Sequence, residues 1–271
     1  MTENKHWAEH TETLARLVRR KPFGVITDID GTISPIAPTP RGATVTEGAR
    51  AALRALSERV QVVAAVSGRS AADARQMVGL ACMEIVGSHG LERWDREAEQ
   101  VNLIEEAIPY VEAARGAVEE LEPLLVRFGI TPEEKGATVS LHYRNAPNRD
   151  MVRDAVYTQV ATIAARHDLE LFEGRYILEL HPPLEVHKGT AITALAEEFR
   201  LAGMVFLGDD ITDLNGFRAL RDLREAGKLE GAALGVVSDE SPADVAAEAD
   251  FTLEGVPDVE RFLGWMLDTV G

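Results

Sequence analysis

Short apolar runs alternate with longer amphipathic segments through the first and last thirds of the chain. The apolar runs lie at 23–27, 60–66, 83–87, 204–208 and 232–237. Runs of this length that end in acidic residues, serine or glycine predict buried strands. Between them, Ala49, Leu53 and Leu56 follow the candidate N-cap Thr46 at a helical spacing. Strands that alternate with helices favour a parallel sheet covered on both faces, so we predict an α/β protein with a Rossmann-like core.

The middle of the chain has a different pattern. Polar and apolar residues alternate strictly through 137–143, and two further strand-like segments meet at Gly174. A helix is predicted between them, with one apolar face formed by Val152, Val156, Val160 and Ile163. Alternating strands favour an antiparallel sheet with one free face, which suits a lid over a site in the core. We place an α+β cap at 108–183 and the catalytic core at 1–107 and 184–271.

The charge of the chain excludes several classes of partner. Lys and Arg total 28 against 45 for Asp and Glu, which gives a formal net charge of −17. Such a charge repels nucleic acids and anionic membranes, so we predict neither as a partner. A phosphate substrate would need positive charge supplied locally, by a metal ion or by a few placed cations.

The single cysteine excludes a disulfide framework. Cys82 lies in the apolar stretch LACMEIV, where we expect a small buried residue.

The first residues are polar and charged rather than a signal peptide, and no apolar run reaches membrane-spanning length. We therefore expect a cytoplasmic protein, which we take to be a monomer.

Two carboxylates follow the first predicted strand, in the sequence DIDGT. Asp28 and Asp30 can serve one centre if the chain leaves the extended conformation at Gly31, since open α/β sheets bind ligands at the carboxyl ends of their strands. Asp28 could attack phosphorus while Asp30 protonates the leaving oxygen. The alternative is a solvated acidic turn, because Asp and Gly are common in turns.

A second acidic loop follows the strand at 204–208, in the sequence GDDITD. Its carboxylates, Asp209, Asp210 and Asp213, would repel one another without a cation. Hard oxygen ligands without neighbouring Cys or His indicate Mg²⁺. The alternative is an acidic helix N-terminus stabilised by the helix dipole.

Two weaker sequence patterns supply a hydroxyl group and a positive charge that a phosphate site could use. Ser67 in the sequence SGR follows another strand, and Lys188 in HKG begins a helix. Ser67 could donate a hydrogen bond to a phosphoryl oxygen, and Lys188 could offset its charge. Each pattern taken alone is more typical of a turn or of a solvated lysine.

In their order and setting, DIDGT, VSGR, HKG and GDDITD resemble the four motifs of the haloacid dehalogenase-like phosphatases. The resemblance implies a nucleophile, an acid/base residue, three phosphate ligands and a Mg²⁺ site. The nucleophile would be Asp28 and the acid/base residue Asp30. The phosphate ligands would be Thr32, Ser67 and Lys188. Mg²⁺ would be held by Asp28, the backbone carbonyl of Asp30, and Asp209. Asp210 and Asp213 would act on the metal through water or would orient Lys188.

Further strings, among them GSHGLE, EEKGATVSLHYR and LELHP, resemble the trehalose-6-phosphate phosphatases. The resemblance implies that cap residues recognise the sugar hydroxyls and that the GSHG stretch lies near the site. The substrate-binding residues would be Arg69, His89, Glu133, Lys135, Arg144 and Glu179. Strict alternation would put Lys135 and Arg144 on opposite faces of a strand, unless the chain kinks at Gly136. A solvated hairpin with surface ion pairs is the alternative.

The chain departs from this family after GDDITD, where Leu214, Asn215 and Gly216 replace a more acidic pattern. We expect this change to alter the packing behind the metal loop rather than to abolish catalysis.

Our hypothesis is a Mg²⁺-dependent phosphatase that acts on trehalose 6-phosphate. One alternative is a phosphatase of the same fold for sucrose 6-phosphate or a glycosyl-phosphoglycerate. Another is a non-catalytic binding or regulatory module.

Overall fold

The computed structural model describes residues 5–37, 42–146, 148–174, 176–239 and 241–270. The chain forms two compact units, which we call the core unit and the cap unit. Residues Met1–Asn102 and Val186–Gly271 form the core unit, and Leu103–Glu185 form the cap unit. The cap predicted at 108–183 begins a few residues later and ends slightly earlier than this unit.

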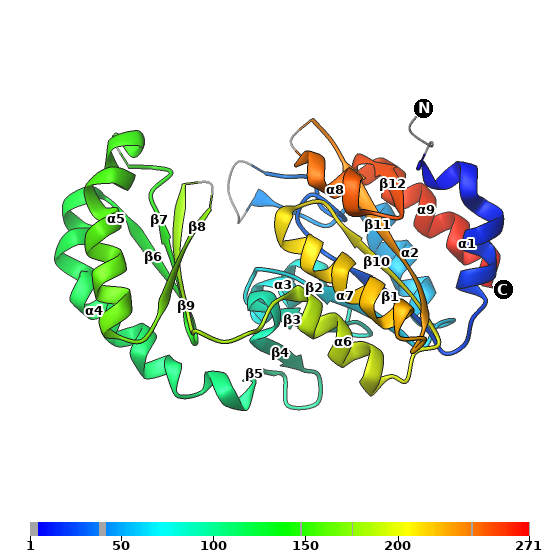
Figure 1. The fold of residues 1–271 in the computed structure, drawn as a ribbon, viewed down its shortest axis with the longest axis horizontal. Coiled ribbons are helices and arrows are strands. Elements are labelled where there is room, and N and C mark those ends of the chain that lie inside the picture. Colours follow the sequence, from blue (N-terminus) through cyan, green and yellow to red (C-terminus); the bar gives the residue numbers. More distant parts are fainter. Residues whose placement is uncertain (1–4, 38–41, 147, 175, 240, 271) are drawn as a thin grey trace. The chain divides into compact units, whose positions relative to one another are not determined.

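An eight-stranded sheet runs through the core unit in the order β12-β11-β10-β1-β2-β3-β4-β5 (Figure 1). The six strands from β12 to β3 are mutually parallel. Their bounds are β1 Phe23–Thr27, β2 Val62–Val66, β3 Glu84–Gly87, β10 Gly203–Gly208, β11 Glu230–Val237 and β12 Phe251–Glu254. This arrangement confirms the α/β fold with a parallel core sheet.

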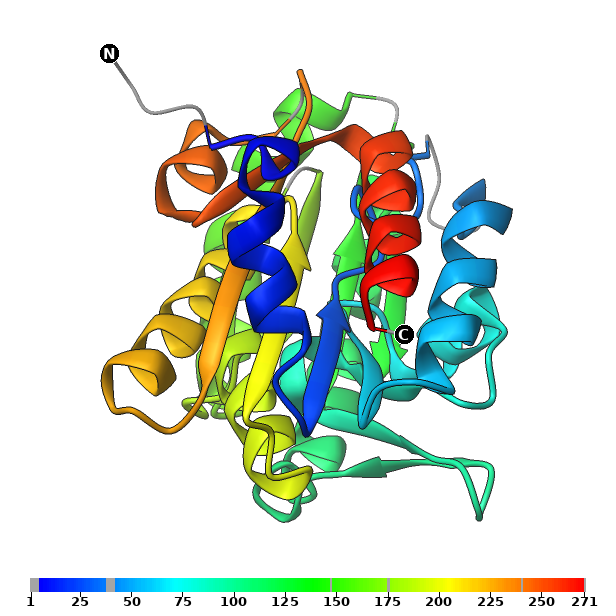
Figure 2. The same ribbon diagram turned by 90° about the vertical axis from the view of Figure 1, so that its right-hand side faces the viewer.

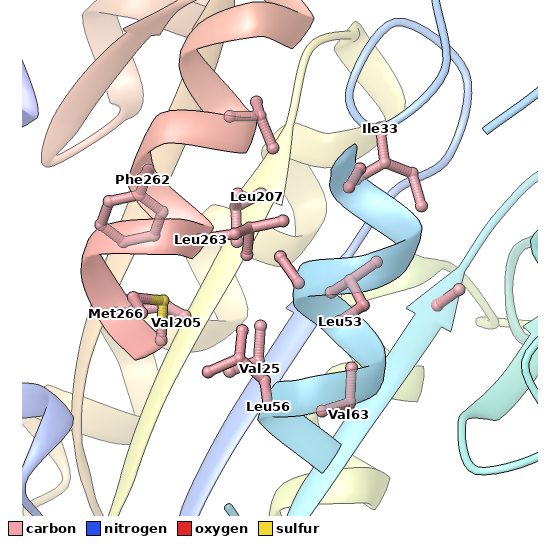
Figure 3. Close-up of a cluster of buried hydrophobic side chains, with 14 of the residues drawn as sticks. Val25, Ile33, Leu53, Leu56, Val63, Val205, Leu207, Phe262, Leu263 and Met266 are labelled. Carbon is pink, nitrogen blue, oxygen red and sulfur yellow. The ribbon is translucent and has the colours of Figure 1, made fainter. Parts of the chain in front are cut away.

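Helices cover both faces of the core sheet. On one face lie α1 (Thr11–Val18), α2 (Glu47–Ser57), α3 (Ala71–Val78) and α9 (Gly255–Val270), and on the other lie α6 (Lys188–Glu198), α7 (Leu214–Glu225) and α8 (Ala243–Glu248) (Figures 1 and 2). Successive residues of one strand enter opposite layers, as Val25 and Ile26 do. In Figure 3, Val25 and Val63 meet Leu53 and Leu56 of α2. Full burial of each such side chain contributes about 2 kcal/mol.

Three details of the core unit differ from expectation. The sequence analysis missed the strands β4 (Glu92–Asp95) and β5 (Gln100–Leu103), and it also missed α8. β4 pairs antiparallel with β3, so the sheet is mixed at this edge. These strands are polar and partly exposed, which removes the apolar signal of a central strand. The expectation that Cys82 is buried was wrong: its side chain is exposed, in a turn between α3 and β3.

The cap unit is a four-stranded antiparallel sheet packed on two helices. The strand order is β6-β7-β9-β8, with β6 Thr131–Lys135, β7 Thr138–His142, β8 Glu170–Gly174 and β9 Ile177–His181. The helices are α4 (Tyr110–Phe128) and α5 (Arg149–Arg166). The predicted apolar face of α5 is buried in their shared core, together with Val139, Leu141, Leu178 and Leu180 from alternate sheet positions.

The opposite face of the cap sheet is polar, and its register follows from the turn at Gly136. Lys135 pairs with Thr138 across this turn, and Gly136 adopts a left-handed φ of 62°. As a result Glu133, Ser140 and Glu179 stand side by side in three neighbouring strands. Among the described residues, no helix combines the length and the apolarity needed to cross a bilayer.

Candidate active site

The acidic motifs meet because their strands are neighbours. β1 lies between β2 and β10, and all three run in the same direction, so Asp28, Ser67 and Asp209 all leave the sheet at its carboxyl edge. The backbone N–H of Asp28 donates to the carbonyl of Leu207 at 2.8 Å, which extends the pairing to the first catalytic candidate. Sequence position along each strand is therefore enough to bring these side chains together.

Lys188, the first residue of α6, is buried among the acids. Its Nζ lies 2.7 Å from Asp28 Oδ1 and 2.6 Å from Asp213 Oδ1. Burial acts to lower the pKa of Lys188, but the Asp213 and Asp28 carboxylates outweigh it and raise the pKa above its ordinary value. Lys188 therefore remains a cation, with a third N–H to offer to a ligand.

Asp213 organises the acidic loop. Its Oδ2 accepts hydrogen bonds from the backbone N–H groups of Asp209 and Asp210, each at 3.0 Å, while its Oδ1 accepts from Lys188. Asp213 has no exposed surface, whereas the side chain of Asp210 is exposed. Asp213 thus fixes both the loop that carries Asp209 and the direction of Lys188.

Three buried carboxylates could hold a metal ion here. Ligand oxygens of Asp28, Asp209 and Asp213 all lie within 4.8 Å of one another. Burial raises the pKa of Asp28 well above its usual range, and the charges of Asp213 and Asp209 add to this against the opposing effect of Lys188. Burial also raises the pKa of Asp209 to about 7, and the Asp213 charge acts in the same direction. A divalent cation with a preference for oxygen would relieve this repulsion, so the donor set fits Mg²⁺.

Gly31 and Thr32 connect the loop after β1 to the acidic loop after β10. Thr32 Oγ1 donates to Asp209 Oδ1 at 3.0 Å. Gly31 has a φ of +82°, and a Cβ at this position would lie 1.9 Å from Asp209 Oδ2. Glycine is required here for two reasons, the left-handed backbone and the close approach of the Asp209 carboxylate.

Asp30 points to Arg69 rather than to Lys188. Arg69 donates from Nε to Asp30 Oδ2 at 2.5 Å and from Nη2 to Asp30 Oδ1 at 2.7 Å. Ser67 Oγ accepts a hydrogen bond from the backbone N–H of Arg69 at 3.2 Å. Residues from DIDGT and SGR therefore share one hydrogen-bonded group, in which each carboxylate oxygen of Asp30 accepts a charge-assisted bond.

The GSHG stretch forms a turn directly against the SGR loop. Ser88 and His89 both have left-handed φ angles, 47° and 57°, which cost a non-glycine residue about 1–2 kcal/mol each. The sequence analysis assigned His89 to substrate binding. Its ring packs over Gly68, where a Cβ would lie 2.7 Å from the imidazole. Ser88 Oγ is buried without a hydrogen-bond partner among the described residues.

On the polar face of the cap sheet, Ser140 links the predicted sugar-binding residues. Lys135 Nζ donates to Ser140 Oγ, and Ser140 Oγ donates to Glu179 Oε1, both at 2.9 Å. Glu133 Oε2 lies 3.6 Å from Lys135 Nζ. The sequence analysis missed Ser140, although its place in the alternating strand, on the same face as Glu133 after a two-residue turn, could have indicated it.

Histidines and Arg144 lie around this cluster. His142 Nε2 is 2.7 Å from Glu133 Oε2, and this hydrogen bond lowers the pKa of Glu133. His181 Nε2 is 3.8 Å from Glu179 Oε2. Arg144 follows the end of β7, with its guanidinium 5.9 Å from the ring centroid of Tyr176. Glu133 thus pairs with Lys135, Lys135 and Glu179 are joined through Ser140, and Arg144 lies beyond the end of β7.

The residues that depart from the family pattern begin α7. Gly216 is buried against Phe206, and a Cβ there would lie 2.3 Å from the aromatic ring. A Cβ on Gly189 of α6 would lie 2.4 Å from the carbonyl oxygen of Asn215. Small residues thus let α6 and α7 approach closely behind the acidic loop, where a larger acidic side chain would not fit at position 216.

The sheet order and the place of the motifs define a haloacid dehalogenase-like α/β fold. A structure described as a haloacid dehalogenase-like hydrolase from Bacteroides thetaiotaomicron matches with a TM-score of 0.57 at 15% identity, over 90% of this chain and 99% of that one. The C-terminal domain of Candida albicans trehalose-6-phosphate phosphatase matches with a TM-score of 0.75 at 19% identity, over 95% of this chain and 96% of that one.

Sequence comparison assigns the chain more narrowly. A family model described as trehalose-phosphatase matches residues 26–256, and the chain belongs to this family. The trehalose-phosphate phosphatase of Mycobacterium avium (strain 104) is 35% identical over 262 residues, which cover 93% of this chain and 63% of the relative. The chain therefore spans less than two thirds of the length of that relative.

Proposed function

We propose that this protein is a Mg²⁺-dependent phosphatase that hydrolyses trehalose 6-phosphate to trehalose and phosphate. The observation that carries the proposal is the buried Asp28 carboxylate, 2.7 Å from Lys188 Nζ and grouped with Asp209 at the carboxyl edge of the sheet. Family membership and the names of the relatives support the reaction and the substrate. A cytoplasmic, monomeric enzyme with a catalytic core and a substrate-reading cap completes the proposal.

Asp28 and Asp30 would divide the chemistry between them. An oxygen of Asp28 attacks phosphorus, the bond from phosphorus to the sugar oxygen breaks, and Asp30 gives its proton to that oxygen. Asp30 then takes a proton from water, the resulting hydroxide attacks phosphorus, and the bond to Asp28 breaks to release phosphate. At the end Asp28 is again a carboxylate and Asp30 again the protonated acid, as each started, so the cycle is balanced.

Positive charge and donors for the phosphoryl group come from three residues and the metal. Lys188, Thr32 and Ser67 would bind its oxygens, and Lys188 is held in place by Asp213. Asp28, Asp209 and the backbone carbonyl of Asp30 would hold Mg²⁺, with Asp210 and Asp213 acting through water or on Lys188. When bound, the metal ion would supply positive charge that stabilises the five-coordinate phosphoryl group of the transition state.

The sugar would be recognised by the polar face of the cap sheet. Glu133, Lys135 and Glu179, joined through Ser140, offer carboxylate acceptors and an ammonium donor within one hydrogen-bonded group. Vicinal hydroxyls, which donate and accept, suit such a group, and a site built for them rejects analogues that lack them. Arg144 and His89 are further candidates for this role.

A substrate panel tests the proposal. Phosphate release is measured with trehalose 6-phosphate, sucrose 6-phosphate, a glycosyl-phosphoglycerate and p-nitrophenyl phosphate, each with Mg²⁺ and with excess EDTA. We expect trehalose 6-phosphate to give the highest kcat/KM and EDTA to abolish turnover on every ester. A higher kcat/KM for another sugar phosphate would move the substrate assignment, and no turnover on any ester would favour the non-catalytic module.

A further inference from the structure

We propose that Phe172 is a specificity-determining residue of the cap unit, whose ring stacks on the face of a glucopyranose ring of the substrate. The neighbouring polar side chains would bind the hydroxyls of that sugar. The sequence analysis gave no role to Phe172. The inference rests on the proposed function, because it names the part of the sugar phosphate that the polar face of the cap sheet recognises.

Phe172 lies on the same face of the cap sheet as the hydrogen-bonding residues. It pairs with Glu179 across β8 and β9, and Glu179 pairs with Ser140 across β9 and β7. Residues that pair directly across neighbouring strands project from the same face, with Cβ atoms about 5 Å apart. The preceding residue, Leu171, packs against the cap core, so alternation along β8 also directs Phe172 to the polar face.

The Phe172 ring is exposed and held in one direction. The residue is 49% exposed, although aromatic residues in strands usually find cover. Its ring makes a T-shaped contact with the imidazole of His181, with centroids 5.2 Å apart and 63° between the planes. This contact restricts the orientation of the ring. An open apolar surface therefore lies beside Glu179 with little conformational freedom to lose when a ligand binds.

A second apolar side chain extends this surface. Ile177 pairs with Gly174, so it lies diagonal to Phe172 on the same face. A Cβ on Gly174 would lie 2.7 Å from Ile177 Cγ2, so only glycine leaves Ile177 its place. Single exposed apolar residues are common on protein surfaces and need no function. Here two of them directly adjoin the group in which Ser140 donates to Glu179.

This combination suits the two kinds of surface on a glucopyranose ring. The equatorial hydroxyls of the sugar lie around its rim, whereas its axial C–H groups form two apolar faces. Carboxylate and ammonium groups can bind the rim while an aromatic ring covers one face. An open-chain polyol offers hydroxyls without such a face. The ring of Phe172 should therefore favour a cyclic sugar over a polyol of similar size.

Steady-state kinetics test this role. Phe172→Ala should raise KM for trehalose 6-phosphate about tenfold, the loss of one stacked aromatic contact. Its kcat should change little, because the ring binds ground state and transition state alike. KM for β-glycerol phosphate, which has no sugar ring, should stay near that of wild type. Phe172→Trp keeps a planar ring and should restore KM for trehalose 6-phosphate.

Val126→Ala is the matched control for the loss of an exposed apolar side chain from the cap unit. Val126 is 77% exposed and lies in α4, which packs on the opposite face of the cap sheet. Its replacement should leave KM unchanged for both esters. Thermal unfolding of all three variants shows whether any of them is destabilised.

A binding measurement tests the same contact without turnover. The three tryptophans of the chain, Trp7, Trp94 and Trp265, all belong to the core unit, so Phe172→Trp places a fluorophore in the cap unit. The variant and wild type are titrated with trehalose, and separately with sorbitol, in the presence of EDTA. We expect trehalose to give a saturable change in the emission of the variant beyond that of wild type, and sorbitol to give none.

Several results would overturn the inference. An unchanged KM for trehalose 6-phosphate in Phe172→Ala would exclude a contact with the sugar, and equal losses of kcat on both esters would indicate a structural role. Equal responses to sorbitol and trehalose would exclude recognition of the ring face. If wild type turns over no trehalose 6-phosphate, the proposed function fails by itself. The titration then decides alone: a saturable response to trehalose supports the role of Phe172, and its absence overturns it.

Discussion

The core and cap units both gather carboxylates beside a lysine, but they balance the charge differently. At the core edge, Asp28, Asp209 and Asp213 are buried with Lys188 as the cation that contacts two of them, and burial raises the pKa of Asp28 and of Asp209. On the cap sheet, Glu133 lies beside His142 and Lys135, it remains partly exposed, and its pKa is lowered.

The two clusters differ in whether their negative charge is balanced by neighbouring side chains. Three ionised carboxylates and one ammonium leave two uncompensated negative charges in the core, so that site is stable only with a cation or with protons bound. The cap cluster forms hydrogen bonds and ion pairs among its own side chains, and in the proposed function it would offer them to a neutral, hydroxyl-rich part of the ligand. Chemistry and recognition thus have different electrostatic requirements, and these can be perturbed separately.

Replacing Asp28, the proposed nucleophile, should have the largest effect. Asp28→Asn should lower Mg²⁺-dependent phosphate release at least about 10³-fold on every ester, because an amide cannot form the covalent intermediate. In the absence of Mg²⁺ the same variant should unfold at a temperature no lower than wild type, since one of three repelling buried charges is removed. Phosphate assays and thermal unfolding measure the two effects. Substantial retained activity would show that Asp28 is not the nucleophile.

Removing a carboxylate from the cap should have an intermediate, selective effect. Glu179→Ala should lower kcat/KM for trehalose 6-phosphate about tenfold to 100-fold, the loss of one hydrogen bond to a charged group, with a much smaller change on p-nitrophenyl phosphate. Glu173→Ala is the control, because Glu173 lies in the same sheet, is exposed, and pairs with Arg153 instead. Equal losses on both esters would argue against recognition of the sugar by the cap.

Replacing a buried carboxylate outside the candidate site should have the smallest effect, and that effect should be on the free energy of unfolding. Asp258 has no exposed surface, but its oxygens accept from the Trp7 indole and the Glu254 backbone and lie 2.9 Å from His6 and Arg261. Burial acts to raise the pKa of Asp258, yet the bonds to Glu254 and Trp7 outweigh it and lower the pKa below its usual value.

The stability that Asp258 contributes should therefore depend on pH in one direction. Asp258→Asn should cost about 1–3 kcal/mol of unfolding free energy at neutral pH. Because the native pKa is lowered, this contribution is present above the unfolded value of about 3.9 and is lost as the pH falls through the native value. Urea unfolding of both proteins between neutral and acidic pH measures the difference. A gap that widens in acid would contradict this assignment.

Sequence patterns were sufficient to predict which side chains meet at the carboxyl edge of the core sheet. Asp28, Ser67 and Asp209 each follow an apolar run, and parallel strands bring such positions to one edge. Patterns were insufficient where a partner comes from another element. The pairing of Asp30 with Arg69 depends on a backbone direction that no local signal carries. The pairing of Ser140 with Lys135 depends on the register of the β6–β7 hairpin, which strand alternation indicates only once the two-residue turn is known.

The same distinction explains the structural misses. β4 is a strand because β3 offers it an edge, and β5 because β4 does so in turn, not because their residues are apolar. The stretch around Cys82 is apolar enough to suggest burial, but a turn directs its side chain outward. Tertiary neighbours determine both the strand conformation of β4 and β5 and the exposure of Cys82, and a single sequence does not identify those neighbours.

The missing side chain of Gly31 has a consequence for how the site can move. The Asp209 carboxylate occupies the space where a Cβ of residue 31 would lie, and it also accepts a hydrogen bond from Thr32. The loops after β1 and β10 are therefore packed tightly against each other. Neither loop can be displaced toward the other alone. Any disturbance that reaches one of them is therefore transmitted to the other, so Asp28 and Asp209 shift together.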